Sequence, residues 1–273
     1  MADRFTIGDA ISFGKDRLSK IAERPIFETE ILLQHILKKD RIFLLLNRDF
    51  EIDKDIFLEL LERRENGEPI EYITNRVSFF SEDFYIAKGA LIPRPETEIL
   101  VEKTLEIANK FENPRILEIG VGSGIISIML SKLLPNAKII GVDISENALK
   151  IAKKNRLDKN IENVEFRQSD LFQNVSEKFD LIVSNPPYIS DSERGKLQKE
   201  LDFEPENALY GGEIGDEVLQ KIVFEFLKRE EKYLLCEMGF DQKEKIQKFE
   251  SPNLQIEFFK DLANLDRGFI AKK

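Results

Sequence analysis

The sequence predicts an α/β protein in which a doubly wound sheet, covered by helices on both faces, follows a small helical bundle and a β-hairpin connector. From Pro114 onward, short β-branched runs alternate with longer amphipathic runs, the pattern of a sheet with crossover helices. The first ~70 residues instead carry apolar side chains three and four positions apart and almost no strand signal. Between these parts, aromatic and β-branched runs flank a polar turn, which is typical of a hairpin.

The composition is that of a soluble globular protein. Of the 273 residues, 42% are hydrophobic and 34% are charged, close to the usual proportions. The sequence has no run of about 18 apolar residues, the length needed to span a membrane, and residues 1–5 lack the basic segment and apolar core of a signal peptide. The single cysteine, Cys236, excludes an internal disulfide and fits a reducing compartment. We therefore expect a cytoplasmic protein without membrane contact, with Cys236 packed in a strand.

The charge balance argues against a broad nucleic-acid interface. The chain has 51 acidic and 41 basic residues, a net charge of −10, whereas binding a phosphate backbone needs many lysines and arginines. A local basic patch is still compatible with this charge, and an acidic surface suits a basic protein partner. No metal site is visible: His35, the only histidine, lies in an apolar helical run and is interpreted as structural.

Three parts of the chain are expected. Residues 1–71 form a helical domain, because residues 27–37 and 53–64 carry apolar positions at helical spacing, the second run with acids in its first turn. Residues 72–92 form a hairpin linker, with strands at 77–80 and 84–86 around the polar turn 81–83. Residues 93–273 form the domain with the doubly wound sheet.

The elements of the third part follow in order. Strands are expected at residues 115–119, 138–143, 164–167, 179–183 and 233–238, and helices at 99–110, 125–134 and 146–157. The prolines of residues 92–98 stiffen the loop before the first of these helices, which Glu96 or Thr97 is expected to cap. Ligands of such sheets bind beyond the carboxyl ends of the strands, so the residues that follow each strand are the candidates for a site.

The first strand ends in a glycine-rich turn. Gly120, Gly122 and Gly124 allow a tight turn and a close approach of the backbone to a ligand. The dinucleotide fingerprint needs a glycine at the position of Ile125, and no P-loop lysine follows. A nucleoside without a pyrophosphate is therefore favoured over a dinucleotide, and a turn shaped by packing alone is the alternative.

Carboxylates follow the next two strands. Asp143 ends the second strand, where a carboxylate can accept hydrogen bonds from both hydroxyls of a ribose; the alternative is an acid at a helix N-terminus, a task that Ser145 could perform. Asp170 follows the third strand and could accept from an adenine amine, with Leu171 covering the ring, or could belong to a simple turn. Three such elements at successive strand ends favour a nucleoside site.

The fourth strand ends in Asn185-Pro186-Pro187-Tyr188. Neither proline can donate to a strand ladder and each has a fixed φ angle, so the corner is rigid. It presents an amide side chain, a proline carbonyl and an aromatic face. Together these groups suit a planar group that carries an NH2, such as a carboxamide or the amine of a base. The alternative is an ordinary turn with a packed tyrosine.

The strand-end elements resemble the S-adenosylmethionine site of Rossmann-like class I methyltransferases, and the whole chain resembles one family of them, the release-factor glutamine methyltransferases (PrmC/HemK family). The resemblance rests on residues 92–98, 117–124, 169–170, 185–188, 203–205, 208–209 and 211–212, and on 28–37 and 63–69 in the helical part. The sequence Asn-Pro-Pro-Tyr occurs in several amino-group methyltransferases, whereas its combination with Pro-Arg-Pro-Glu-Thr-Glu is more specific.

The resemblance implies that S-adenosylmethionine donates a methyl group to the side-chain nitrogen of the glutamine in the Gly-Gly-Gln loop of class I peptide release factors, leaving S-adenosylhomocysteine. The candidate catalytic residues are Asn185, Pro186 and Tyr188, and the candidate substrate-binding residues are Asn185, Pro186, Pro187, Tyr188, Arg94 and Glu96. The candidate cofactor-binding residues are Glu118, Gly120, Val121, Gly122, Ser123, Gly124, Asp143, Asp170, Leu171 and Asn185. We expect a monomer that contacts release factors but no nucleic acid.

An amide nitrogen is a poor nucleophile, because its lone pair is delocalised into the carbonyl. In the expected mechanism Asn185 Oδ1 and the Pro186 carbonyl each accept a hydrogen bond from one N–H group of the substrate amide, and Tyr188 lies against the amide plane. Positioning and electrostatics then carry catalysis without a strong base.

The chain departs from the family pattern at three positions. Asn75 and Asn264 stand where the family commonly has glycine, and Leu171 stands where an aromatic residue can stack on adenine.

Several alternatives stay open at this point. The substrate could be an adenine or guanine amine of a nucleic acid, or a glutamine of a ribosomal protein, or the chain could bind the cofactor without catalysis. The helical domain could recognise the substrate or only stabilise the fold. Residues 92–98 could cover the cofactor or form a rigid connector with a surface ion pair. Glu118 and Glu237 could reach the methionyl ammonium or bond nearby backbone.

Overall fold

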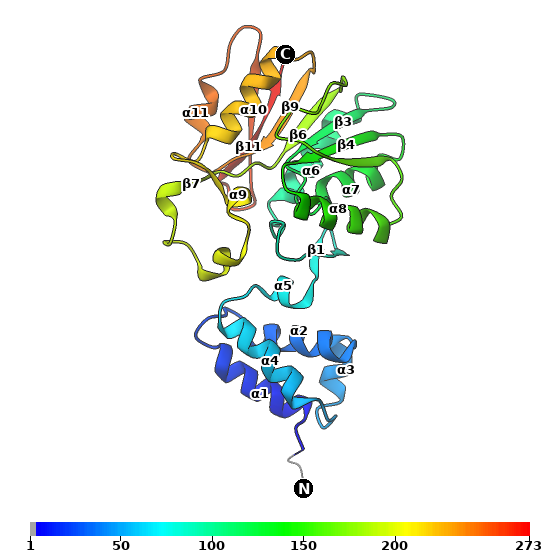
Figure 1. Ribbon diagram of the computed structural model, residues 1–273, viewed down its shortest axis with the longest axis vertical. Coiled ribbons are helices and arrows are strands. Elements are labelled where there is room, and N and C mark those ends of the chain that lie inside the picture. The colour runs from blue at the N-terminus through cyan, green and yellow to red at the C-terminus, as the bar shows by residue number, and fades with distance from the viewer. Residues whose placement is uncertain (1–3) are drawn as a thin grey trace. The chain divides into compact units, whose positions relative to one another are not determined.

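The computed structural model describes residues 4–273 and divides the chain into two units. One unit comprises the residues up to Arg76 together with Gln198–Phe203, and the other comprises Val77–Leu197 and Glu204–Lys273. Figure 1 shows the first as a group of helices and the second as a sheet covered by helices, which confirms the predicted fold class. The expected absence of a signal peptide partly concerns residues 1–3, which lie outside the described part.

Between residues 4 and 76 the chain forms α1 (Ile7–Leu18), α2 (Pro25–Leu37), α3 (Arg41–Leu46), α4 (Lys54–Glu65) and α5 (Ile70–Thr74). Their apolar stripes meet in one core that includes Leu32, Phe57 and Leu61. Gly14 of α1 lies tightly against Thr29 of α2, because a Cβ at Gly14 would come within 2.4 Å of the Thr29 hydroxyl. The helical bundle predicted from the spacing of apolar residues is therefore present.

A buried arginine links three segments of this helical unit. Arg64, in the last turn of α4, is only 4% exposed and donates to Glu28 of α2 over 2.6 Å. It also pairs with Glu200 in the short 3₁₀ helix η2 (Lys199–Phe203). This pairing gives a physical reason why residues 198–203 group with the helices, which the sequence did not indicate.

The predicted hairpin is formed by β1 (Val77–Phe79) and β2 (Glu82–Phe84). Phe80 and Ser81 make the turn with φ angles of 50° and 59°, as a two-residue hairpin turn requires. The second strand therefore begins within the segment expected to be the turn. The Phe80 amide donates to Glu98 in the first turn of α6 (Thr97–Ala108) over 2.7 Å, which fixes the hairpin to the second unit.

Seven strands form the central sheet in the order β10-β11-β9-β6-β3-β4-β5. Its parallel part comprises β3 (Arg115–Ile119), β4 (Lys138–Asp143), β5 (Val164–Gln168), β6 (Leu181–Ser184) and β9 (Tyr233–Glu237), all of them predicted. The sequence did not predict the antiparallel hairpin of β10 (Gln255–Lys260) and β11 (Asp266–Lys272), which completes one edge of the sheet.

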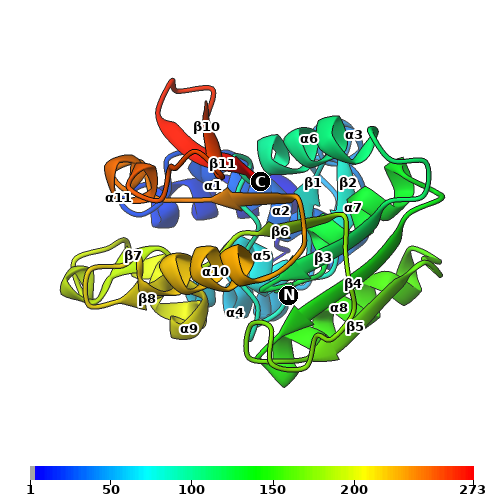
Figure 2. The same cartoon turned by 90° about the horizontal axis from the view of Figure 1, so that it is seen from above.

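Helices cover both faces of this sheet, as Figure 2 shows from above. One face packs against α6, α7 (Ile125–Leu133) and α8 (Glu146–Asp158), and the other packs against α10 (Glu217–Lys228) and α11 (Lys243–Gln247). The chain between β6 and α10 carries β7 (Ile189–Ser190), η1 (Asp191–Glu193), α9 (Glu206–Leu209) and β8 (Tyr210–Gly212). Across residues 4–273, no helix is both long enough and apolar enough to cross a membrane.

The two faces of the sheet have different chemistry because successive strand residues point to opposite sides. Leu117, Ile119 and Cys236 belong to the apolar core shared with α10, and burial raises the pKa of the Cys236 thiol. Glu118 and Glu237 point to the opposite face, where they bond to residues of α7 and α6. Cys236 is thus the packed core thiol expected from the sequence, and two buried acids stand behind the strand ends.

Candidate functional site

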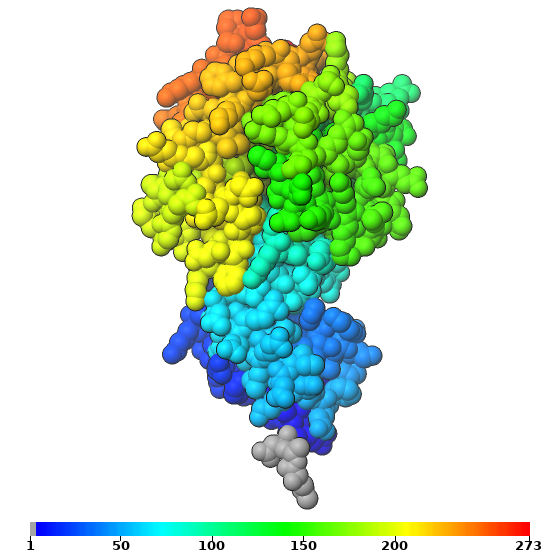
Figure 3. Space-filling view, in the orientation of Figure 1, coloured from blue at the N-terminus to red at the C-terminus, as the bar shows by residue number. Residues whose placement is uncertain are grey.

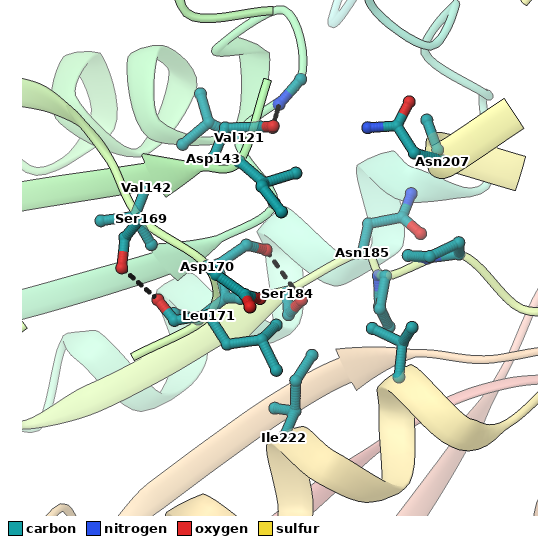
Figure 4. Close-up of a pocket in the computed structure, with 18 of the residues that line it drawn as sticks. Val121, Val142, Asp143, Ser169, Asp170, Leu171, Ser184, Asn185, Asn207 and Ile222 are labelled. Atoms are coloured by element: carbon teal, nitrogen blue, oxygen red, sulfur yellow. Dashed lines mark hydrogen bonds between the residues drawn. The ribbon is translucent and has the colours of Figure 1, made fainter. Parts of the chain in front are cut away.

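A cavity of about 700 Å³ opens at the carboxyl ends of the parallel strands. Its walls include the residues that follow β3, β4, β5 and β6, which is where a doubly wound sheet binds its ligands. Figure 4 shows Val121, Asp143, Leu171 and Asn185 arriving at this cavity from four different strand ends. The volume falls within the roughly 300–1,000 Å³ typical of small-molecule sites.

The glycine-rich turn after β3 has left-handed backbone that glycine favours. The φ angles are 75° at Gly120, 56° at Gly122 and 81° at Gly124. A Cβ at Gly122 would meet nothing within 4 Å, whereas a Cβ at Gly124 would come within 2.9 Å of Ala152. Gly124 is therefore needed for packing against α8, and Gly122 leaves an open approach to the backbone in the cavity wall.

The same turn is held in place from α8. Ser123 is 3% exposed, and its carbonyl accepts a hydrogen bond of 2.9 Å from Asn155 of that helix. Val121 donates through its amide to the Val142 carbonyl over 3.1 Å. Val121 and Ser123 both line the cavity. Hydrogen bonds to α8 and β4 thus hold the backbone of the turn.

Asp143 serves the turn and the following helix at once. Its Oδ2 accepts from the Gly122 amide and its Oδ1 accepts from the Ser145 amide, both over 2.8 Å. Burial raises the pKa of this carboxyl, although the hydrogen bonds oppose that shift. Ser145 itself caps α8 by accepting from Ala148. Asp143 therefore bonds the start of the helix segment and also lines the cavity, and its role toward a ribose stays a prediction.

Asp170 and Leu171 form the wall after β5. Leu171 has a φ angle of 46°, and its carbonyl accepts from the Ser169 hydroxyl over 2.9 Å, a bond drawn in Figure 4. Asp170 is exposed and accepts from Gln173 over 3.0 Å. Both residues line the cavity, so this geometry is compatible with a simple turn and also with a wall that binds a ligand.

Asn185, Pro186 and Pro187 line the cavity at the end of β6. The end of that strand is tied to its neighbour, because the Ser184 hydroxyl donates to the Ile119 carbonyl over 2.8 Å. Asn185 Nδ2 donates to Thr97 Oγ1 over 3.1 Å. Thr97, the first residue of α6, also lines the cavity. The amide of the corner therefore has one end bonded to protein.

Tyr188 departs from the expected arrangement. It is not part of the cavity wall, and its hydroxyl lies 3.4 Å from Glu237 Oε1. Burial raises the pKa of Tyr188 to about 12, and the nearby negative charge of Glu237 is the second cause of this rise. The chain turns after the prolines into β7, which pairs with β8. In this structure Tyr188 therefore packs behind the corner instead of presenting an aromatic face to the cavity.

Two buried glutamates stand behind the cavity and not in its wall. Glu118 is fully buried; its Oε2 accepts from the Ser127 amide over 3.0 Å and from the Ser127 hydroxyl, whereas its Oε1 has no partner among residues 4–273. Burial raises its pKa to about 8. Glu237 is 1% exposed, and burial raises its pKa to about 7.

Arg94 and Glu96 do not line the cavity, but their neighbours Leu91 and Pro93 do. Arg94 pairs with Glu204, whose side chain is 2% exposed. Glu204 also accepts from the Ile92 amide over 2.9 Å. The proline-rich loop is therefore both a rigid connector with an ion pair and a contributor to the cavity wall.

The sequence did not identify several wall residues. Glu96 or Thr97 was expected to cap α6, and Glu96 occupies the N-cap position, but its side chain makes no capping hydrogen bond. Other wall residues missed by the sequence lie in or directly after α9 and α10: Asn207, Ala208, Val218, Lys221, Ile222, Glu225 and Arg229. The family motifs at residues 92–98 and 208–209 were signals for Thr97 and for α9, whereas nothing local in α10 indicates a site. In Figure 3 the yellow surface and the bright green surface lie next to each other on the face in view.

The chain matches two protein-family models, the PrmC N-terminal domain over residues 9–74 and the methyltransferase small domain over residues 95–212. It is 42% identical to the release factor glutamine methyltransferase of Buchnera aphidicola subsp. Schizaphis graminum, covering 92% of this chain and 94% of that protein. With the protein of the same name from Clostridium acetobutylicum it shares 36% identity, over 89% of this chain and 90% of the relative.

Solved structures support the fold alone. The hMettl16 catalytic domain in complex with a MAT2A 3'UTR hairpin matches with a TM-score of 0.57 at 16% identity, over 70% of this chain and 74% of that one. A methyltransferase from Pyrococcus furiosus matches with a TM-score of 0.54 at 20% identity, over 71% of this chain and 90% of the other.

The family follows from the sequence relatives. Because the chain is similar to them over nearly its full length, it belongs to the release factor glutamine methyltransferase family.

Proposed function

We propose that this protein transfers a methyl group from S-adenosylmethionine to the side-chain nitrogen of the glutamine in the Gly-Gly-Gln loop of class I peptide release factors. One observation carries the proposal. The rigid corner of Asn185, Pro186 and Pro187 opens onto the same cavity as the glycine-rich turn and Asp143, in a chain of this family. The corner proposed to bind a planar amide and the surface proposed to bind a nucleoside thus line one cavity.

The cavity fits S-adenosylmethionine. The open side of Gly122 admits a ligand to the backbone. Three backbone amides bond the Asp143 carboxylate, which has about four acceptor sites and so keeps one for a ribose hydroxyl. Asp170 and Leu171 would hold the adenine, and Glu118 Oε1, which has no partner in the described chain, would lie behind the methionyl end. When bound, the cofactor supplies an electrophilic methyl group on a sulfonium.

The protein's own contribution is to orient the amide. In the proposed mechanism Asn185 Oδ1 and the Pro186 carbonyl each accept a hydrogen bond from one N–H group of the glutamine side chain. These bonds fix the direction of the nitrogen and favour the positive charge that develops on it. Pro187 and Ala208, which line the same cavity, would exclude water. The methylated amide cation is strongly acidic and loses its proton to water, so no strong base is assigned.

Three predicted substrate residues lie outside the cavity wall. We assign Arg94 and Glu96 to the loop that shapes the glutamine entrance, through its wall residues Leu91 and Pro93. We assign Tyr188 to supporting the corner from behind, through its contact with Glu237. These assignments place the direct substrate contacts on Asn185 and Pro186.

The proposed partner is the release factor, recognised by the helical domain at residues 1–71, with the linker at 72–92 and the catalytic domain at 93–273. We infer a monomer that works in the cytoplasm without contacting nucleic acid. The net charge of −10 supports a protein partner over a nucleic-acid partner.

The test offers labelled S-adenosylmethionine with a purified unmethylated release factor, ribosomal protein and RNA in parallel. Label should enter the release factor alone. A release factor with alanine in place of the Gly-Gly-Gln glutamine is the matched control and should stay unlabelled. Label that enters only RNA, or only ribosomal protein, would overturn the proposed substrate.

A further inference from the structure

The side chains of Asn185, Thr97 and Glu237, which come from three different segments, are linked by hydrogen bonds. Strands β6 and β9 are parallel neighbours with Ser184 opposite Cys236, so Asn185 and Glu237 lie at the same level of two adjacent strand ends. Thr97 begins α6, which packs on β9. Thr97 is 3% exposed and Glu237 is 1% exposed. The contacts among these residues are therefore sheltered from water.

The hydrogen bonds among them run in one direction. Asn185 Nδ2 donates to Thr97 Oγ1 over 3.1 Å, and the Thr97 hydroxyl donates to Glu237 Oε2 over 2.8 Å. A hydroxyl has a single hydrogen. Since that hydrogen is used toward the glutamate, the Thr97 oxygen can only accept from the asparagine. The NH2 end of the Asn185 amide is thereby the end that faces Thr97.

We propose that Thr97 and Glu237 are positioning residues that set the orientation of the Asn185 amide, so that its oxygen is the atom offered to the substrate. The proposal rests on the function proposed above. An amide has nearly the same shape when its oxygen and nitrogen are exchanged, so packing alone does not select one orientation. The hydrogen-bond partners at Thr97 make that selection.

The orientation matters because the NH2 group of the substrate amide donates two hydrogen bonds. An Asn185 turned with its NH2 toward the cavity would present donors to donors and lose the acceptor on which the mechanism depends. Tyr188 contributes from the far side, because its hydroxyl donates to the other oxygen of Glu237 over 3.4 Å. Both oxygens of the glutamate are thus engaged, which holds the carboxylate in place for Thr97.

Thr97→Val removes the hydroxyl with almost no change of shape, and Thr97→Ser keeps it. The kcat of Thr97→Val toward the release factor should fall roughly 10- to 100-fold, as for other lost supporting groups. Its affinity for S-adenosylmethionine, measured by calorimetry, should change little, and Thr97→Ser should stay close to the unsubstituted protein. Thr104→Val is the matched control, since Thr104 is buried on the same helix and donates to the Leu100 carbonyl of its own helix.

A double-mutant cycle separates positioning from general damage. In an Asn185→Ala background, Thr97→Val should cause almost no further loss of kcat, because the side chain it orients is gone. A second readout does not depend on turnover. The Asn185 side-chain NH2 protons, assigned by NMR from their loss in Asn185→Ala, should be protected from exchange in the unsubstituted protein and in Thr97→Ser. They should lose that protection in Thr97→Val.

The outcomes distinguish this inference from the proposed function. If the unsubstituted protein fails to methylate the release factor, the function fails, and the NMR comparison still decides whether Thr97 holds Asn185. Unchanged kcat and unchanged NH2 protection in Thr97→Val would overturn the positioning role. Equal losses in Thr97→Val and Thr104→Val would overturn it as well, because they would show only the cost of a buried hydroxyl. Should Thr97→Val not fold, Thr97→Ala with the same readouts replaces it.

Discussion

Asn185 is the residue on which the proposed chemistry depends most. Its Nδ2 is bonded to Thr97, which leaves Oδ1 for the substrate. Asn185→Ala should lower kcat by roughly 10²–10³-fold, by analogy with the loss of one preorganised hydrogen-bonding group in other active sites. Affinity for the cofactor should fall less, as calorimetry would show. Turnover near that of the unsubstituted protein would remove Asn185 from the mechanism.

Asp143 should act on the cofactor and not on the methyl-transfer step. Asp143→Ala removes the acceptor proposed for the ribose hydroxyls and also frees the Gly122 amide. Cofactor affinity should fall roughly 10- to 100-fold, the size expected for charged hydrogen bonds. Asp158→Ala is the control, since this exposed residue at the end of α8 pairs with Lys154 and lies outside the cavity wall, so its loss should leave cofactor affinity unchanged. Unchanged affinity in Asp143→Ala would place Asp143 outside the cofactor site.

Glu118 should make the stability of the protein depend on pH. Its pKa rises from an ordinary 4.5 to about 8 in the folded protein. The folded state therefore binds the proton more tightly, so its contribution is complete below pH 4.5 and is lost as pH rises through about 8. Roughly 2–5 kcal/mol of unfolding free energy should disappear across this range. Denaturation of Glu118→Gln at several pH values should show a flatter profile, and an unchanged slope would contradict this origin.

Which site residues the sequence could predict depends on how each reaches the site. Gly122, Asp143 and Asn185 follow strand ends directly, and parallel strands all end at one edge of the sheet, so local pattern sufficed to predict that they line one cavity. Thr97 reaches the site only because α6 packs beside β9, and its bond to Glu237 spans 140 positions. Tyr188 was expected to face the cavity, but a buried acceptor behind the corner engages its hydroxyl.

Among the elements, the predicted helices and strands have an apolar period, but α1 and α10, which are also amphipathic, were not predicted, and neither was the hairpin of β10 and β11, which depends on distant pairing. The edge hairpin exists because β11 pairs with β9 across a long stretch of chain, which no local pattern reveals. The cap expected for α6 is absent for a local reason. The amides of Thr97, Glu98 and Ile99 donate to carbonyls three residues earlier in the proline-rich loop. Those bonds satisfy the free N–H groups that a capping side chain would otherwise serve.

Helix α4 should depend on its buried arginine. Arg64→Ala removes the partner of Glu28, whose side chain is 17% exposed, and leaves that carboxylate partly buried without a counter-charge. The loss should be about 2–4 kcal/mol of unfolding free energy, near the range for breaking a buried ion pair. Arg4→Ala breaks an exposed pair in the same unit and should cost less than about 1 kcal/mol. Equal denaturation midpoints for the two variants would contradict this role of Arg64.

For the whole chain, the question is whether the helical domain recognises the substrate or only stabilises the protein. The two units have separate cores. Removing residues 1–71 should raise KM for the release factor strongly while changing methylation of a short glutamine peptide little. Cofactor affinity of the truncated protein checks that the catalytic domain is folded. Parallel losses on both substrates, with cofactor binding intact, would contradict a recognition role.

The most direct test of the proposed activity is the position of the added methyl group. A release factor incubated with the protein and S-adenosylmethionine should be digested and sequenced by tandem mass spectrometry, with Asn185→Ala as the matched control. The mass of one methyl group on the side chain of the Gly-Gly-Gln glutamine, strongly reduced with Asn185→Ala, is the predicted result. A methyl group on any other residue, or equal methylation by both proteins, would contradict the proposed mechanism.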